Sequence, residues 1–344
     1  MPVVRLQMEW VVEMTSKAYI VPSMSEIASI PWNGLTVAST FSGCGGSCLG
    51  YRMAGFRVAY ANEFIPAAQD TYRRNHPSSV LDTRDIRDVT PESLMSMAGV
   101  SVGELDVLDG SPPCASFSTS GARSKGWGEV RSYSDTKQRV DDLFLEYIRI
   151  LQGVQPKVFI AENVAGLVKG CAKGFFMDIL GRMKGCGYDV KARLLNASKL
   201  GVPQERERII FVGVRSDIGK PPLHPDPHTS TVTVRDVVPN AVKIKLSGKP
   251  NYWAPANRPS PTITSTAYRL PLTGYLSCSA HIQVRDEPER IRKYTIPELK
   301  ALFSFPQDFI LTGSENQQWE RLGRSVTPYM MKAVGECVRD RILG

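Results

Sequence analysis

The amino-terminal half of the chain alternates short apolar runs with polar turns, and this alternation constrains the fold more than any other feature. Leu35 to Phe41 is a predicted buried strand, and a glycine-rich turn at residues 42–50 follows it and opens a helix. A second apolar run, Phe56 to Ala61, ends close to the carboxylate of Glu63. Strands that alternate with helices build a mostly parallel sheet with helices on both faces. We therefore expect an α/β domain.

The glycine-rich turn differs from the two common phosphate-binding loops. The dinucleotide fingerprint has glycine at its first, third and sixth positions, but Cys48 occupies the sixth position counted from Gly43. The turn also lacks the lysine of a P-loop. It suits a cofactor that needs close backbone approach but carries no pyrophosphate. Glu63 follows the second strand at the spacing of an acid that hydrogen-bonds ribose hydroxyls.

A reactive thiol is predicted at the end of a later strand. The apolar run from Leu105 to Leu108 leads into residues 109–114, which contain two adjacent prolines followed by Cys114. The prolines fix the backbone on the approach to the thiol and remove two hydrogen-bond donors. A cysteine in such a turn is either a small buried side chain or a held nucleophile. The other motifs of the chain favour the nucleophile.

Further polar groups follow along the chain. Residues 119–141 contain five basic residues and three glycines, and we expect a long mobile loop that acts as a lid. A helix is predicted at 142–151 and a strand at 157–161, which ends at the carboxylate of Glu162. A helix at 174–183 and a strand at 188–194 come next. Gln204 to Arg208 then leads into a strand at 209–214.

The composition changes after Lys220. Nine of the 24 prolines lie between Pro221 and Pro261, and residues 215–258 hold seven Lys and Arg against three Asp and Glu. Short runs at 231–234 and 242–245 have strand-like composition, a helix is predicted at 294–303, and residues 322–328 open an amphipathic helix that ends at Val338. The formal net charge of the chain is +8. We expect a basic, loop-rich second domain that meets a polyanion.

The cysteines argue for a reducing compartment. Their number, seven, is odd, and they show no CxxC or Cys/His spacing, so we expect neither a disulfide framework nor a metal site. The sequence contains no run of 18 apolar residues and no secretion signal at its start, which predicts a cytosolic protein without a membrane span.

In their order and identity, these motifs resemble those of the C5-cytosine DNA methyltransferases of bacterial or phage type, from about Leu35 to the C-terminus. The carrying segments are Phe41-Ser42-Gly43-Cys44-Gly45-Gly46, Glu63-Phe64, Asp85-Ile86, Pro112-Pro113-Cys114, Glu162-Asn163-Val164, Gln204 to Arg208, Arg258 to Thr262 and Gly323-Arg324-Ser325-Val326.

The resemblance implies a mechanism and a catalytic set. Carbon 5 of cytosine is a poor nucleophile until a thiolate, here that of Cys114, adds to carbon 6. Glu162 would donate a proton toward N3, Arg208 would neutralise charge at O2, and Arg206 would position the group around it. The target base must leave the duplex to reach the thiol. A base, reached through water, would then remove the proton from carbon 5.

The resemblance also implies a cofactor, a substrate and an architecture. The cofactor is S-adenosylmethionine and the substrate is double-stranded DNA. The implied cofactor-binding residues are Phe41, Gly43, Cys44, Gly45, Gly46, Glu63, Phe64, Asp85, Ile86, Pro113, Leu143, Arg324 and Ser325. The implied DNA-binding residues are Ser118, Arg123, Lys125, Lys243, Lys245 and Lys249. The implied fold is a doubly wound, Rossmann-like α/β domain with a smaller, loop-rich target-recognition domain. The expected domains are a catalytic and cofactor-binding domain at 1–217 plus 318–344, of which 1–33 is an unassigned arm, a target-recognition domain at 218–292 and a hinge at 293–317.

Two departures from the family pattern leave alternatives open. Ala115 stands where the family usually has Gln, and Arg324 stands where it has Asn beside the reactive end of the cofactor. Arg324 could hold the carboxylate of carboxy-S-adenosylmethionine, which would give 5-carboxymethylcytosine. The other option for Arg324 is an outward contact with a DNA phosphate or an acid near the C-terminal helix.

Other functions with the same fold are a transfer-RNA cytosine-5 methyltransferase and a catalytically dead DNA-binding regulator. We expect a monomeric, cytoplasmic protein of a prokaryotic or phage-infected cell. A cognate restriction endonuclease acting on the same site would be its partner.

Overall fold

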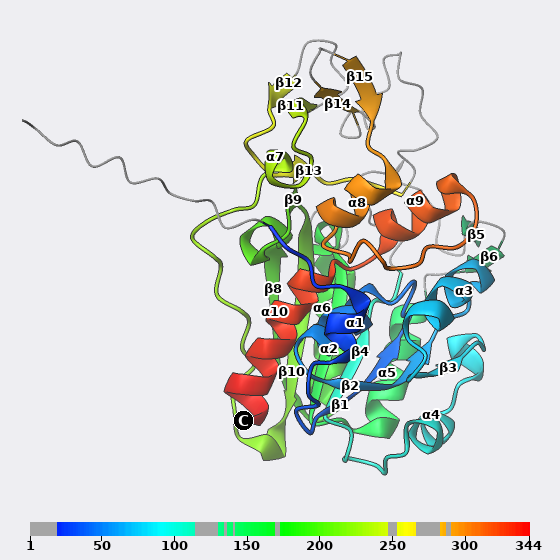
Figure 1. The fold of residues 1–344 in the computed structure, drawn as a ribbon. Helices are drawn as coiled ribbons and strands as arrows, with labels where there is room; N and C mark the ends of the chain where they lie inside the picture. The colour runs from blue at the N-terminus through cyan, green and yellow to red at the C-terminus, as the bar shows by residue number, and fades with distance from the viewer. Residues whose placement is uncertain are drawn as a thin grey trace, which may run out of the picture.

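The main body of the protein is an α/β domain built on a seven-stranded sheet (Figure 1). The computed structural model describes residues 19–113, 130–133, 136–139, 142–168, 173–246, 253–265, 283–286 and 290–344. The strand order is β3-β2-β1-β4-β7-β10-β8, with β10 antiparallel to both β7 and β8 and the other pairs parallel. The strands are β1 (Thr36–Thr40), β2 (Arg57–Asn62), β3 (Val80–Asp82), β4 (Val107–Gly110), β7 (Val158–Val164), β8 (Tyr188–Asn196) and β10 (Glu207–Arg215). The predicted doubly wound α/β fold is confirmed.

Helices cover both faces of this sheet. They are α2 (Gly46–Met53), α3 (Pro66–Asn75), α4 (Pro91–Ala98), α5 (Leu143–Val154), α6 (Lys173–Gly185) and α10 (Pro328–Val338). The chain returns at its end so that α10 packs against α2, the first helix after the glycine-rich turn. No helix in the described ranges is long and apolar enough to cross a membrane.

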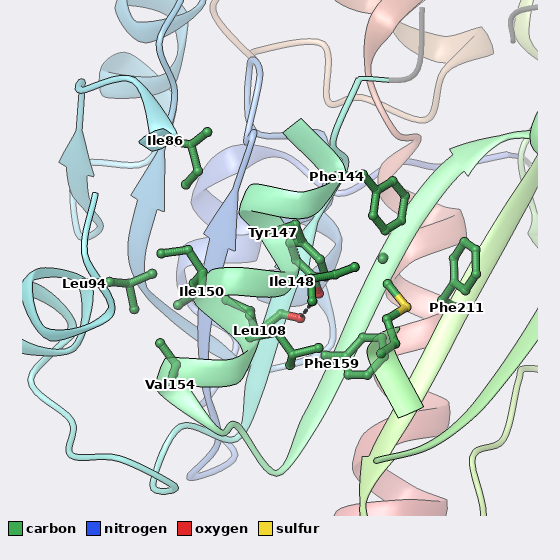
Figure 2. Packing of buried hydrophobic residues seen from close by; sticks show 14 of the residues in the cluster. Ile86, Leu94, Leu108, Phe144, Tyr147, Ile148, Ile150, Val154, Phe159 and Phe211 are labelled. Carbon is green, nitrogen blue, oxygen red and sulfur yellow. Dashed lines mark hydrogen bonds between the residues drawn. The ribbon is translucent and has the colours of Figure 1, made fainter. Parts of the chain in front are cut away.

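An apolar cluster packs α5 against strands β4 and β7 of the large sheet. Figure 2 shows side chains of α5, among them Tyr147, packed over Leu108 of β4 and Phe159 of β7. The buried Tyr147 hydroxyl lies 3.2 Å from the carbonyl of Leu108 and 3.0 Å from that of Ile160, so it joins the two strands. This packing holds the strand end from which the Pro112-Pro113 turn departs.

A smaller four-stranded sheet forms a second layer of the molecule, drawn at the top of Figure 1. Its order is β12-β11-β14-β15, and all its neighbouring pairs are antiparallel. The remaining elements here are β11 (Ala241–Lys245), β12 (Trp253–Pro255), β14 (Gln283–Asp286), β15 (Arg290–Lys293), α7 (Val234–Val237), α8 (Ile296–Leu302) and α9 (Glu315–Arg324). A two-stranded pair, β9 (Gln204–Glu205) with β13 (Ser260–Pro261), connects this layer to the main body. The exact domain boundaries stay a prediction.

Two local predictions were wrong, and both concern where a helix begins. The run at 231–234 is not a strand, because Thr233 caps α7 and forms a reciprocal capping box with Asp236. The helix predicted to open at 322 is split, because α9 ends at Arg324 and α10 begins at Pro328, a residue favoured at the first position of a helix.

Two other regions contain structure that the sequence analysis left out. The arm at 1–33 contains α1 (Met24–Ala28), which Ser23 caps together with Glu26. The segment at 119–141, predicted as a mobile loop, contains the antiparallel pair β5 (Val130–Tyr133) and β6 (Thr136–Arg139). Val130, Tyr133 and Thr136 are residue types that favour strands.

Candidate active site

A cavity of about 850 Å³ lies where the parallel strands of the large sheet end. That volume falls within the range of about 300–1,000 Å³ typical of small-molecule sites. Thirteen of the predicted site residues line it: Phe41, Gly43, Cys44, Gly46, Glu63, Phe64, Ile86, Pro113, Glu162, Arg206, Arg208, Arg324 and Ser325. The fold therefore brings motifs spread over most of the chain to one place.

On the cofactor side of the cavity, Glu63 holds the glycine-rich turn in place through hydrogen bonds. One oxygen of its carboxylate, Oε2, accepts a hydrogen bond from the backbone N–H of Gly43 at 2.7 Å, and Oε1 accepts one from Ile65 at 2.7 Å. Burial raises the pKa of Glu63, although these backbone hydrogen bonds act in the opposite direction. The acid thus joins the end of β2 to the glycine-rich turn and keeps lone pairs toward the cavity.

Two glycines of the turn are required by packing. A Cβ on Gly46 would lie 2.1 Å from the carbonyl oxygen of Val326, and one on Gly45 would lie 2.1 Å from Nε2 of His76. Gly45 has φ 91° and is not among the residues that line the cavity. The sequence analysis attributed these glycines to close approach of a cofactor, whereas the structure places the C-terminal segment and α3 against them.

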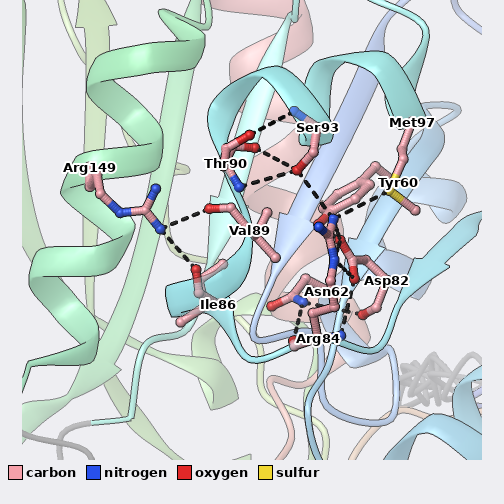
Figure 3. Close-up of polar contacts among 10 residues, drawn as sticks. All are labelled: Tyr60, Asn62, Asp82, Arg84, Ile86, Val89, Thr90, Ser93, Met97 and Arg149. Carbon is pink, nitrogen blue, oxygen red and sulfur yellow. Dashed lines mark hydrogen bonds and ion pairs between the residues drawn. The ribbon is translucent and has the colours of Figure 1, made fainter.

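The loop that carries Asp85 and Ile86 is held by its neighbours (Figure 3). Asn62 donates to the carbonyl of Arg84, and Arg149 of α5 donates to the carbonyl of Ile86 at 2.9 Å. Ile86 lines the cavity, but Asp85 does not, because its carboxylate accepts from the backbone and side chain of Arg87.

Leu143 also lies away from the cavity. It is fully buried in the core at the start of α5. A helix that packs on the sheet needs an apolar residue at this position, and the cofactor contact of Leu143 stays a prediction.

The opposite side of the cavity carries a buried ion pair. Arg208 Nε lies 2.7 Å from Glu162 Oε1, and both side chains are largely buried. They come from β10 and β7, which pair with Ile210 opposite Glu162. Burial lowers the pKa of Arg208, while the charge of Glu162 acts in the opposite direction. The pair can present one donor-rich edge to a planar polar ligand.

Arg206 is a structural clamp in this arrangement. Its guanidinium is buried and donates to the carbonyls of Ile263, Gly323 and Ser325 at 3.4, 3.1 and 2.9 Å. It also lies 5.5 Å from the centre of the Phe303 ring. These contacts join β9–β10 to the segment that returns from the small sheet and to the α9–α10 junction.

The turn that precedes Cys114 is tied to the acid-bearing strand. Asn163, next to Glu162, donates to the carbonyl of Pro112 at 3.0 Å. Pro113 lines the cavity. Cys114 itself, together with Ser118, Arg123, Lys125 and Lys249, lies outside the described residues.

Arg324 meets an acid of its own helix. Its Nε and a terminal nitrogen lie 3.0 and 2.8 Å from Oε1 of Glu320, one turn earlier in α9. Both residues line the cavity. The contact matches the alternative in which Arg324 pairs with an acid of the C-terminal region.

Lys243 and Lys245 lie on one face of the small sheet. Lys243 is opposite Arg285 of β14, and Lys245 is opposite Trp253 of β12. The Trp253 ring lies 5.4 Å from the Lys245 ammonium and 4.9 Å from the Arg285 guanidinium. Three cations and an aromatic ring therefore share this face.

Sequence reasoning missed several polar residues of the cavity wall. They are Ser42, Ser47, Asn62, Ser111, Asn163, Asn196, Glu205, Glu320 and Arg321. Ser42, Ser47 and Asn163 lie inside or beside recognised motifs, so their position in the sequence was a usable signal. Asn196 and Glu320 stand in elements without a motif, and only the tertiary structure places them here.

The fold and the cavity fit an adenosine-containing cofactor and define a class of enzyme. The first turn of α2 has no side-chain cap, so its N–H groups remain for an anionic group such as a carboxylate. Glu63 offers acceptors for hydroxyl groups, and Phe64 and Ile86 supply apolar surface. With an ion pair and a proline-fixed turn on the other side, the class is a cofactor-dependent group transferase.

Comparisons with known proteins identify the family. The C-5 cytosine-specific DNA methylase model matches residues 35–253 and 228–339. The chain is 30% identical over 333 residues to the Type II methyltransferase M1.HphI of Haemophilus parahaemolyticus, covering 88% of the chain and 86% of that protein. It is 37% identical over 195 residues to M.NgoPII of Neisseria gonorrhoeae, which covers 57% of the chain but only 52% of that relative.

Solved structures agree on the fold. A prophage-encoded DNA modification methyltransferase of E. coli superimposes with a TM-score of 0.66 at 21% identity, over 90% of the chain and 100% of that structure. A variant of Spodoptera frugiperda DNMT2 gives 0.62 at 18%, over 89% and 99%. The chain belongs to the C-5 cytosine-specific DNA methylase family, the DNA (cytosine-5-)-methyltransferases, whose methyl donor is S-adenosylmethionine.

Proposed function

We propose that this chain methylates carbon 5 of a cytosine flipped out of double-stranded DNA, with Cys114 as the nucleophile. The observation that carries the proposal is the convergence of the Glu162–Arg208 pair, Pro113 and the Glu63-anchored glycine turn on one cavity. This arrangement can hold a planar base against a cofactor bound at the opposite wall. A base inside a duplex cannot enter such a cavity, because both its faces are stacked.

The residues of the chain divide the chemical work. The Cys114 thiolate adds to carbon 6, and the electron pair of the 5,6 double bond becomes available at carbon 5. S-adenosylmethionine, when bound, supplies an electrophilic methyl group. Proton loss from carbon 5 then restores the double bond and expels the thiolate. A free thiol is only slightly ionised at neutral pH, so the surroundings of Cys114 must favour its anion.

Glu162 and Arg208 act on the base. The addition of the thiolate places negative charge on N3 and O2, where the guanidinium of Arg208 stabilises it and a protonated Glu162 donates to N3. Arg206 acts through them, since its contacts with Ile263, Gly323 and Ser325 fix the strand that carries Arg208. We therefore assign Arg206 a positioning role.

The small sheet would contact the DNA. Phosphate contacts by Lys and Arg give affinity, and side chains that reach base edges give specificity. Lys243, Lys245 and Arg285 share one face of the sheet, which supports this role. Ser118, Arg123, Lys125 and Lys249 remain candidates from the sequence. The similarity to Type II methyltransferases favours a DNA substrate over a transfer RNA, and the Glu162–Arg208 pair in the cavity favours catalysis over a merely regulatory role.

The position of Arg324 favours the ordinary cofactor. The guanidinium already contacts the carboxylate of Glu320, which partly neutralises its charge and competes with a carboxylate on a cofactor. The competing donor, carboxy-S-adenosylmethionine, is tested by offering both cofactors together and analysing the product DNA by mass spectrometry. Carboxymethylcytosine that disappears with Arg324→Asn would establish the alternative.

Trapping with a modified substrate tests the nucleophile. Duplex DNA containing 5-fluorocytosine should form a covalent adduct with the wild-type chain, because fluorine cannot leave as a proton does. Cys114→Ser should abolish turnover and the adduct but retain cofactor binding. An adduct on another cysteine would overturn the assignment.

The recognition sequence and the partner follow from a cellular experiment. Bisulfite sequencing of DNA from cells that express the chain should reveal methylated cytosines in one short sequence context. M1.HphI and M.NgoPII are Type II methyltransferases. We therefore propose a restriction endonuclease of the same site as the partner, and cleavage of unmethylated but not methylated DNA would test it.

A further inference from the structure

A buried acid lies directly beneath the cofactor side of the cavity. Asp109 is the third residue of β4 and its side chain is 1% exposed. Its Oδ2 accepts a hydrogen bond from the Ser39 hydroxyl at 2.9 Å, and its Oδ1 accepts one from Tyr51 of α2 at 3.2 Å. Within the described part of the chain, no lysine or arginine forms an ion pair with it.

Hydroxyl groups connect this acid to the cavity. The Ser42 hydroxyl lies 3.2 Å from that of Ser39, and Ser42 lines the cavity. Ser47, in the first turn of α2, lines the cavity as well. One layer of serine side chains, rather than apolar packing, therefore separates the carboxyl group from the cavity.

Among the residues that the structure describes, none places a positive charge beside Asp109 to balance an ionised carboxylate. The titratable groups that face it are acidic, namely Tyr51 and Cys48 on α2, Tyr147 on α5 and Glu162 on β7. The groups from β1 and its turn are hydroxyls. Burial raises the pKa of Asp109 to about 7, and hydrogen bonds from Ser39 and Tyr51 oppose that rise.

We propose that Asp109 is the electrostatic partner of the sulfonium group and lets the protein distinguish the charged methyl donor from its neutral product. The inference rests on the proposed function. A buried acid without a counter-ion gains one when a cationic ligand binds above it, and loses it when the transferred methyl group leaves a neutral thioether. A unit charge about 10 Å away, at an effective dielectric constant of about 20, changes such an equilibrium about tenfold.

Calorimetry of the two ligands without DNA tests the proposal. S-adenosylmethionine and S-adenosylhomocysteine are titrated into the full chain from pH 6 to 8.5, in buffers of different ionisation enthalpy. In the wild type, the ratio of the two affinities should rise about tenfold with pH. Near pH 7, the methyl donor should also release more protons than the product does.

Three variants separate charge from packing. Asp109→Asn keeps the shape of the side chain but should make the affinity ratio constant with pH. Any proton release that remains in this variant comes from the ligands and is subtracted from the wild-type value. Tyr51→Phe deletes one hydrogen bond to the carboxylate and should move the transition to higher pH. Asp106→Asn is the matched control, because Asp106 precedes the same strand but pairs with Lys157 and does not line the cavity.

The outcomes are distinguishable. A wild-type ratio that stays constant with pH overturns the inference, as does a ratio that rises equally in Asp109→Asn. If Asp109→Asn fails to fold, the wild type and Tyr51→Phe decide the question alone. If neither ligand binds the wild type, the proposed function fails and not only the role of Asp109.

Discussion

The two sides of the cavity hold their buried acids in different ways. On the cofactor side, Glu63 and Asp109 are buried acids whose described partners are N–H and hydroxyl groups, and neither forms an ion pair in the described ranges. On the base side, the buried acid Glu162 forms an ion pair with Arg208, and Arg206 is buried among carbonyl groups beside them. The protein itself neutralises the base-side acid.

This difference has a physical meaning. A buried carboxylate without a counter-ion is costly, so a site keeps one only where the ligand supplies a cation. A buried guanidinium stabilises negative charge that develops during the reaction. The comparison suggests that the cavity is most stable, and most active, when both ligands are present.

Breaking the base-side ion pair should have the largest effect. Arg208→Met leaves Glu162 buried and unpaired, which typically costs about 3–5 kcal/mol of stability. Turnover should fall by roughly 100-fold or more, since one donor to a developing charge is worth that much. Urea denaturation and methylation kinetics measure the two effects.

A double variant shows which effect is chemical. Arg208→Met combined with Glu162→Gln removes the unpaired charge and should recover most of the lost stability, yet activity should stay low. Recovery of activity along with stability would mean that the pair only supports the fold.

The glycine turn on the cofactor side should respond less strongly. In Gly46→Ala, the new Cβ meets the backbone carbonyl of Val326, which cannot move without shifting α10. We expect a loss of about 1–3 kcal/mol and weaker cofactor binding, measured by thermal unfolding with and without ligand. Gly181→Ala in α6 is the control, because nothing lies within 4 Å of that Cβ. It should stabilise the chain by up to about 1 kcal/mol.

The unpaired acid predicts a pH dependence of stability. The pKa of Asp109 is raised by burial from 3.8 to about 7 in the folded chain. Its contribution to stability is therefore complete below about pH 4 and is lost as the pH rises through 7. Relative to Asp109→Asn, the wild type should lose up to about 1.4 kcal/mol per pH unit in this window. Urea midpoints of both proteins from pH 4.5 to 8 test this, and parallel curves would contradict it.

Much of the fold and part of the site could be predicted from the sequence. The predicted strands at 35–41 and 56–61 agree with β1 and β2 within about a residue at each end, because a buried parallel strand is a continuous apolar run. Glu63 and Glu162 were predicted because they come just after such runs, and Arg208 because it leads directly into one. Asp85 and Leu143 were assigned by motif and position, and the structure places them away from the cavity.

Long-range contacts explain what the sequence could not reveal. Arg206 contacts carbonyls of residues more than fifty positions away, and the requirement for Gly46 comes from Val326. The role we infer for Asp109 depends on its surroundings in three dimensions, where the described neighbours offer hydroxyl groups and no counter-ion. No spacing along the chain carries that information.

The smallest predicted effect concerns the face of the small sheet, whose cations Lys243, Lys245 and Arg285 are half-buried and lie outside the cavity. Lys243→Gln with Lys245→Gln should reduce the slope of log affinity against log salt by about 1.8, since each phosphate contact contributes about 0.9. Gel-shift titrations between roughly 50 and 300 mM salt measure this slope, because counterion release dominates the salt dependence in that range. Lys184→Gln is the control, because Lys184 is exposed at the end of α6. It lies just before Tyr188, the first residue of the edge strand β8 of the large sheet, and is not part of the small sheet. An unchanged slope in the double variant, or an equal change in the control, would mean that β11 does not contact the DNA. A reduced slope with unchanged sequence preference would mean that these lysines contact phosphates and that other residues recognise the bases.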